Sequence, residues 1–155
     1  MAGETGISQL VFDTNFLDAD QNVDALMNVY FGNNSSFWTT LNLTYSFPDA
    51  ASDFSYAPDS GAFFGAFSST QISAVQGILA LYANVSGLSF SYLPGGSANG
   101  NLRFSEATGI STGFGYYPNP TESGGDVWLN NTAYDNPVIG SYAYHTLLHE
   151  IGHTL

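Results

Sequence analysis

Residues 141–155 read SYAYHTLLHEIGHTL, and this stretch carries the clearest pattern in the chain. Its apolar side chains recur every three or four residues, which is the spacing of one face of an α-helix. These apolar positions are Tyr144, Leu148, Ile151 and Leu155. The chain's three histidines form a second stripe, more than about 90° away around the same helix. We therefore predict a helix that begins near Ser141, packs one face on a core and turns the other towards a cleft.

Positions 149–153 form the pattern H-E-x-x-H. Two histidines four residues apart lie about 40° apart around a helix, close enough to bind one metal ion. The carboxylate of Glu150 lies roughly 100° further round, where it can reach a metal-bound water. This pattern is typical of zinc hydrolases, so we predict His149 and His153 as metal ligands and Glu150 as general base. The alternative is two surface histidines and a solvated glutamate on one helix, which the separate apolar stripe disfavours.

His145 lies one turn before His149. Because each turn of an α-helix rises about 5.4 Å, a third histidine there does not easily join the same tetrahedral site. We expect His145 to line the cleft or the surface.

The composition excludes several classes of partner. Thirteen acidic residues stand against one basic residue, Arg103, for a net charge of −12. Nucleic acids and anionic membranes need clusters of lysine and arginine, so neither is expected as a partner. The sequence contains no cysteine, so a metal ion has to be bound by histidine and carboxylate side chains.

A chain of 155 residues fits one domain with a real core. It has no apolar run of membrane-spanning length, and its first residues do not resemble a Sec-type signal peptide. The thin acidic coat is typical of a protein that is soluble outside the cell, and a secreted protein without disulfides is more often bacterial than eukaryotic.

The remaining elements follow from local patterns. Ser68 and Gln71 form a capping box that opens a helix running to about Asn84, with Gly87 as its end. A shorter helix is expected over residues 23–30, and residues 49–67 are expected to form a long aromatic loop. Alternation of apolar and polar residues predicts strands at 40–47 and 88–93, and two further short strands are expected at 101–105 and, after Gly124-Gly125, at 126–130. This order predicts an α+β fold with α/β layers, in which two long helices pack on a twisted sheet.

Four segments, taken in order, resemble the catalytic domain of the serralysins, the secreted bacterial zinc endopeptidases of the metzincin group. The first is Leu43-Thr44-Tyr45-Ser46-Phe47-Pro48, and the second is the long helix that opens at Ser68. The third is Gly124-Gly125-Asp126-Val127-Trp128-Leu129-Asn130, and the last is the H-E-x-x-H stretch. The resemblance runs from about residue 23 to the end and implies a mostly parallel sheet of the metzincin type.

The resemblance also implies roles for particular residues. His149 and His153 look like the first two zinc ligands, and Glu150 looks like the base that activates water for attack on a peptide bond. Residues 125–129 look like the edge strand above the cleft, to which an extended protein or peptide substrate adds as a β-strand. Gly125, Val127 and Trp128 are the candidate substrate-binding residues. An ordinary sheet strand with Trp128 in the core is the equal alternative.

The full metzincin pattern, H-E-x-x-H-x-x-G-x-x-H followed by a Met-turn, extends past Leu155. The third histidine, the Met-turn and the calcium-binding glycine-rich repeats of the family are not in this sequence. We therefore expect residues 1–155 to form the N-terminal, upper subdomain of the catalytic domain, with weak activity or none by itself. Calcium would belong to the full-length protein.

Two further alternatives remain open. In one, the C-terminal half of the domain or another chain completes the zinc site, for example through a neighbour's His145 or an acidic side chain. In the other, the chain is a secreted, non-enzymatic binding domain on a protease-like scaffold, with its tyrosine-rich loops serving recognition.

Overall fold

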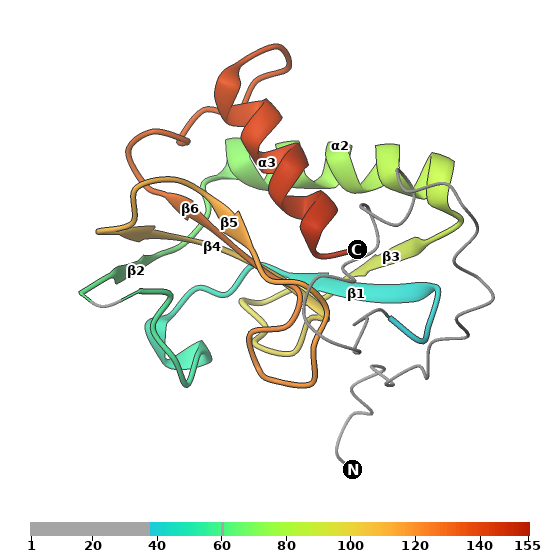
Figure 1. Cartoon of the computed structure of the whole chain (residues 1–155), viewed down its shortest axis with the longest axis horizontal. Coiled ribbons are helices and arrows are strands. Elements are labelled where there is room, and N and C mark those ends of the chain that lie inside the picture. Colours follow the sequence, from blue (N-terminus) through green and yellow to red (C-terminus); the bar gives the residue numbers. More distant parts are fainter. Residues whose placement is uncertain (1–37, 60) are drawn as a thin grey trace, which may run out of the picture.

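The computed structural model describes residues 38–59 and 61–155 (Figure 1). The helix predicted over residues 23–30 lies outside this range. Among the described residues, no helix combines the length and apolar character that crossing a membrane requires.

A six-stranded mixed sheet forms the centre of the molecule, with the strand order β3-β1-β4-β6-β5. The strands of this path are β1 (Asn42–Ser46), β3 (Ser89–Tyr92), β4 (Leu102–Thr108), β5 (Phe114–Gly115) and β6 (Asp126–Asn130). β1, β3, β4 and β6 run parallel to one another, whereas β5 is antiparallel to β6. The sheet is therefore mostly parallel, and its strands at 40–47, 88–93, 101–105 and 126–130 are confirmed to within a few residues.

The first long helix, α2 (Ser69–Ser86), begins and ends where its capping residues predict. The Ser68 hydroxyl accepts a hydrogen bond from the Gln71 amide at 3.3 Å, and the Gln71 side chain accepts one from the Ser68 amide at 2.8 Å. Gly87 ends the helix in the left-handed conformation, with φ of 75°. Glycine adopts this conformation without steric cost, which explains why the helix stops there.

The second long helix, α3 (Tyr142–His153), is capped by Ser141, whose hydroxyl accepts a hydrogen bond from the Tyr144 amide at 3.1 Å. The residues buried on α3 differ by about one position from the apolar stripe that the sequence predicts. The apolar residues buried on α3 are Ala143, Leu147 and Ile151, whereas Tyr144, Leu148 and Leu155 are only partly buried. The reason is that α3 contacts α2, β5 and β6 together, so its buried arc is wider than a single stripe.

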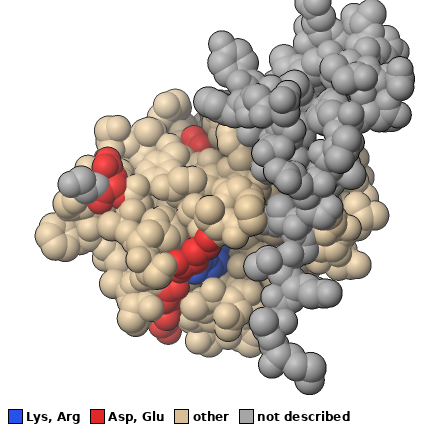
Figure 2. Space-filling view, turned by 60° about the horizontal axis from the view of Figure 1, so that its bottom comes forward, with Lys and Arg blue, Asp and Glu red and all other residues tan. Residues whose placement is uncertain are grey.

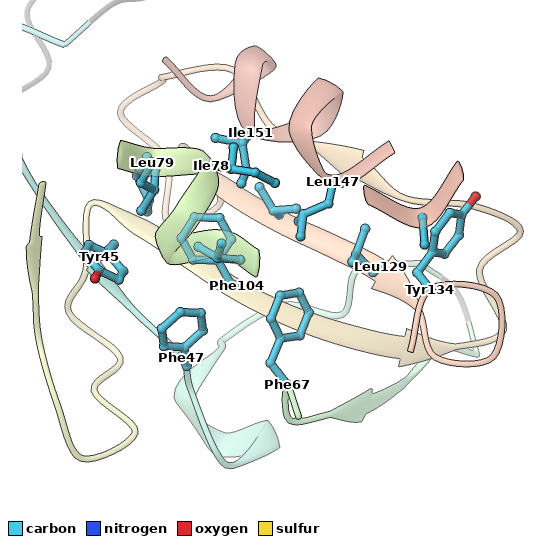
Figure 3. Close-up of a cluster of buried hydrophobic side chains, with 14 of the residues drawn as sticks. Tyr45, Phe47, Phe67, Ile78, Leu79, Phe104, Leu129, Tyr134, Leu147 and Ile151 are labelled. Carbon is cyan, nitrogen blue, oxygen red and sulfur yellow. The ribbon is translucent and has the colours of Figure 1, made fainter. Parts of the chain in front are cut away.

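Both helices cover the same side of the sheet, and the main core lies between them and the strands (Figures 1 and 3). The strands contribute alternate residues to it, as the two-residue period of a strand requires. The fully buried members from the three central strands are Leu43, Leu102, Phe104, Val127 and Leu129. This packing fixes α3 on the sheet and thereby fixes the position of its histidines.

The sequence predicted a long loop over residues 49–67, but this segment also contains regular secondary structure. It contains a short 3-10 helix, η2 (Ala51–Asp53), and a strand, β2 (Phe63–Gly65), that pairs antiparallel with residues 106–108 of β4. Its residue Phe67 belongs to the main core and Phe63 is exposed, whereas Phe54, Tyr56 and Phe64 pack on the face of the sheet opposite the helices. There Phe54 packs on Trp128 with ring centroids 4.6 Å apart, within a second core that includes Ala107 and Ile110. Four of the five aromatic residues of this segment, all except Phe63, therefore serve packing.

The chain's one basic side chain is buried on this second face. The Arg103 guanidinium donates to both carboxylate oxygens of Asp126, at 2.8 and 2.6 Å, and to the backbone carbonyl of Glu122 at 2.8 Å. It also donates to the carbonyl of Asp53 at 3.1 Å and lies over the Phe54 ring, 4.4 Å from its centroid. Figure 2 shows this basic group beside acidic side chains on an otherwise largely uncharged face. Arg103 thus joins η2 to the loop between β5 and β6.

Glu106 provides a test of pH dependence. Its carboxylate accepts a hydrogen bond from the buried Gln71 side chain at 2.9 Å. Burial raises the pKa of Glu106 and the charge of Asp135 adds to this, although the hydrogen bond from Gln71 opposes it. A carboxyl whose folded pKa is raised contributes its stabilisation below its ordinary pKa and loses it as the pH rises through the folded value.

Glu106→Gln keeps an acceptor for Gln71 but has no carboxyl that titrates. We therefore expect its free energy of unfolding, relative to that of the wild type, to be higher at pH 7.5 than at pH 4. Urea unfolding of both proteins at these two pH values measures the difference. A difference that stays constant, or that moves towards the wild type as the pH rises, would contradict this reading of Glu106.

Candidate metal centre

The outer face of α3 brings two imidazoles together. His149 is exposed and His153 is half-buried. Their Nε2 atoms lie 3.0 Å apart, and their rings are nearly perpendicular, with centroids 4.5 Å apart. Two nitrogens bound to one tetrahedral zinc ion, each at 2.0–2.1 Å, lie about 3.3 Å apart. The two side chains therefore fit as two ligands of a single zinc ion.

Glu150 lies on the inner side of this pair and is only 9% exposed. Its Oε2 accepts a hydrogen bond from the backbone amide of Gly115 at 2.9 Å. Burial raises the pKa of Glu150, while His153, His149 and the Gly115 amide act in the opposite direction. The result is an oriented carboxylate next to two imidazoles, with a raised affinity for a proton. That is what a general base requires.

Strand β5 packs directly on α3, and two glycines, Gly115 in the strand and Gly113 just before it, lie at close contacts. A Cβ at Gly115 would lie 2.3 Å from the carbonyl oxygen of Glu150, and one at Gly113 would lie 2.6 Å from the Leu129 side chain. The contact with the Glu150 backbone is not sterically tolerable, so only glycine at position 115 lets the strand come close enough for its amide to reach Glu150.

The candidate substrate-binding residues Gly125, Val127 and Trp128 do not lie at an edge of the sheet. β6 pairs with β4 on one side and with β5 on the other. Val127 is 0% exposed and Trp128 is 1% exposed, and the Trp128 indole donates to the Tyr56 hydroxyl at 3.0 Å. The prediction that residues 125–129 form an edge strand is therefore wrong, and the edge next to the histidines is β5. The substrate-binding roles of these three residues stay predictions that have lost their structural basis.

The C-terminal half of α3 is supported from α2. The Tyr82 hydroxyl donates to the carbonyl of Leu148 at 3.0 Å. The same hydroxyl lies 2.7 Å from where a Cβ of Gly152 would be, so a larger residue at position 152 would displace it. Gly152, between Ile151 and His153 in the motif, is thus explained by the approach of Tyr82.

Two aromatic residues flank the end of the helix. The Trp38 indole donates to the carbonyl of Thr154 at 2.7 Å, satisfying one of the carbonyls that a helix leaves free at its C-terminus. The Tyr117 ring packs edge-on against His153, with centroids 5.2 Å apart, and is 41% exposed. His153 is therefore held between Tyr117 on the loop after β5 and its own partner His149.

Within residues 38–59 and 61–155, no group of three or more histidine and carboxylate side chains could together hold a metal ion. His145 is exposed, as expected from its position one turn before His149. The described residues bring two imidazoles and one carboxylate together.

Sequence reasoning missed the residues that surround the histidines, namely Trp38, Tyr82, Gly113, Gly115 and Tyr117. A two-residue strand is too short to show alternation. The signal that was available is the pair of glycines two residues apart, directly before Tyr116 and Tyr117, which is consistent with close approach of a strand to another backbone.

Comparison with known proteins gives one informative similarity. The chain is 32% identical to serralysin G of Dickeya chrysanthemi over 138 residues, which covers 83% of this chain and 29% of that protein. No protein-family model matches the sequence. The chain spans less than a third of the curated relative it matches. At this moderate identity the similarity indicates a serralysin-like relationship.

Gly115 provides a direct test of the contact between β5 and α3. We expect Gly115→Ala to lower the free energy of unfolding by about 1–3 kcal/mol, as overpacking of a tight contact does. Gly77→Ala is the matched control, because a Cβ at this exposed position of α2 meets nothing within 4 Å. Alanine there should stabilise the helix by about 0.5–1 kcal/mol. Chemical denaturation of both variants measures the two changes in the free energy of unfolding. Equal changes would contradict the close packing of β5 on α3.

Proposed function

We propose that this chain is the part of a serralysin-like zinc endopeptidase that carries two zinc ligands and the general base. The observation that carries the proposal is the geometry on α3, where the two Nε2 atoms lie 3.0 Å apart beside an oriented, mostly buried carboxylate. The similarity to serralysin G supports the same reaction class.

In this proposal His149 and His153 bind the zinc ion through Nε2. Zinc, when bound, acidifies water and polarises the carbonyl of the scissile peptide bond. Glu150 accepts a proton on its carboxylate from the attacking water and passes it to the leaving amide nitrogen. The Gly115 amide holds one oxygen of Glu150 in place, which leaves the other oxygen for this proton transfer.

The substrate would bind along β5. This strand lies at the end of the strand order, next to α3, and is paired with β6 on its inner side. An extended peptide that adds to a sheet edge is held by backbone hydrogen bonds, and pockets for its side chains give selectivity. Phe114 to Tyr117 form that edge, and the half-exposed Tyr117 ring lies between it and His153.

The third zinc ligand comes from outside the described residues, either from a further part of the same protein or from a second chain. The family resemblance implies secretion to the cell exterior, and it implies calcium binding in a longer protein. Both belong to this proposal.

Zinc-dependent hydrolysis of casein tests the proposed function. The chain is assayed alone and mixed with a polypeptide that carries the rest of a serralysin catalytic domain. We expect hydrolysis in the mixture that a zinc chelator abolishes and added zinc restores, with little or none from the chain alone. Hydrolysis that persists in excess chelator, or none in a mixture shown to associate, would contradict the proposal.

A further inference from the structure

The stripe of histidines on α3 contains two overlapping pairs with the same spacing. His149 and His153 are four residues apart, and so are His145 and His149. The chain has three histidines in all and no cysteine, so no imidazole or thiolate elsewhere in the sequence can replace a member of this stripe.

The outer pair is accessible. His145 and His149 are both exposed. Within the part of the chain that the structure describes, the His145 side chain makes no hydrogen bond, ion pair or ring contact. His153, in contrast, is half-buried against the Tyr117 ring. An ion arriving from solvent therefore reaches the outer pair once His149 turns away from His153.

The outer pair also has a suitable geometry. Side chains on an α-helix lean towards its N-terminus, so the ring of His149 leans towards the turn that carries His145. The inner pair already shows that a spacing of four residues on this helix brings two Nε2 atoms to 3.0 Å. Rotation of the exposed His149 side chain gives the outer pair the same approach.

We propose that His145 and His149 form a second site for a divalent transition-metal ion, which excludes simultaneous occupation of the His149–His153 site. His149 is shared, and one Nε2 atom binds one ion, so the chain holds a single ion in one of two positions. The outer position lies about 6 Å further along the helix axis from the inner one, on the side away from Glu150. An ion there is held without access to the base.

The proposal goes beyond the proposed function, although it shares His149 with it. Cu²⁺ is the most sensitive probe because imidazole sites bind it more tightly than Ni²⁺ or Zn²⁺. The test measures binding of Cu²⁺ and of Zn²⁺ to the full chain by titration calorimetry. It compares the wild type with His145→Gln, His149→Gln and His153→Gln, and circular dichroism checks that each variant is folded.

We expect one ion per chain in the wild type, in His145→Gln and in His153→Gln. In His149→Gln the affinity should fall at least tenfold, because His145 and His153 are about 12 Å apart along the axis. Spin-resonance spectra of Cu²⁺ should show two nitrogen ligands in His153→Gln and one in the double variant His145→Gln/His153→Gln.

The outcomes separate the two claims. If His153→Gln loses affinity as far as His149→Gln does, the outer site does not exist, whereas the proposed zinc site is untouched. If His145→Gln, which retains only the inner pair, binds no Zn²⁺ while His153→Gln still binds Cu²⁺, the proposed zinc site fails and the outer site stands. Equal Cu²⁺ affinity of His153→Gln and the double variant would overturn the outer site.

Discussion

Glu150→Gln should leave zinc binding intact while it lowers peptide hydrolysis by about a thousandfold, within the range that loss of a general acid–base group costs. Glutamine keeps the shape of the side chain and an oxygen that can accept the hydrogen bond from the Gly115 amide. It cannot take a proton from water at neutral pH. The expected loss therefore falls on the chemical step, with the position of β5 preserved.

The measurement is the hydrolysis of a peptide by the reconstituted domain, with zinc content determined on the same preparations. Glu106→Gln is the matched control, because it also removes a partly buried carboxylate but lies on β4, in contact with α2 and away from the histidines. Activity of Glu150→Gln within tenfold of the wild type would contradict the role proposed for Glu150. Loss of zinc in this variant would instead show that its carboxylate helps to hold the ion.

Arg103→Met should have the largest effect on stability, a loss of about 3–5 kcal/mol, which is typical when one partner of a buried ion pair is removed. The Asp126 carboxylate, 1% exposed, would be left without the guanidinium that now donates to both of its oxygens. The carbonyl groups of Asp53 and Glu122 would lose the same donor. Urea unfolding measures the loss, and a change below about 1 kcal/mol would contradict a central role for Arg103.

The pH dependence of Arg103→Met provides a second readout. Burial already raises the pKa of Asp126 to about 6, against the opposing effect of Arg103. Without Arg103 the pKa of Asp126 in the folded protein rises further. Since a raised folded pKa costs stability as the pH rises through it, the deficit of the variant should be larger at pH 8 than at pH 5. In Arg103→Met/Asp126→Asn, which has no buried carboxylate at this position, that difference should disappear.

The sequence alone predicted the elements whose boundaries are set by local chemistry. The capping box at Ser68 and Gln71 and the glycine at position 87 defined α2, and Ser141 defined the start of α3. The short apolar run at 126–130, with Gly124-Gly125 before it, predicted β6 to the residue. In each case the residues that allow the prediction lie in the same turn or strand as the boundary that they define.

The errors concern features that depend on distant residues. β2 exists because residues 63–65 pair with the end of β4, some forty positions further along the chain. The status of β6 as an inner strand depends on β5, which is too short to predict. The motif itself predicted the histidines and Glu150, but the glycines and aromatic residues that fix their positions come from three other segments.

The most direct test of the central claim is zinc K-edge X-ray absorption of the chain loaded with one equivalent of zinc. We predict a coordination shell with two imidazole nitrogens at about 2.0–2.1 Å, completed by oxygen ligands. In His149→Gln, which carries no pair of histidines four residues apart, the imidazole scattering should fall to that of at most one ring. A spectrum without imidazole scattering in the wild type, or one unchanged by His149→Gln, would contradict the claim that α3 holds a metal ion.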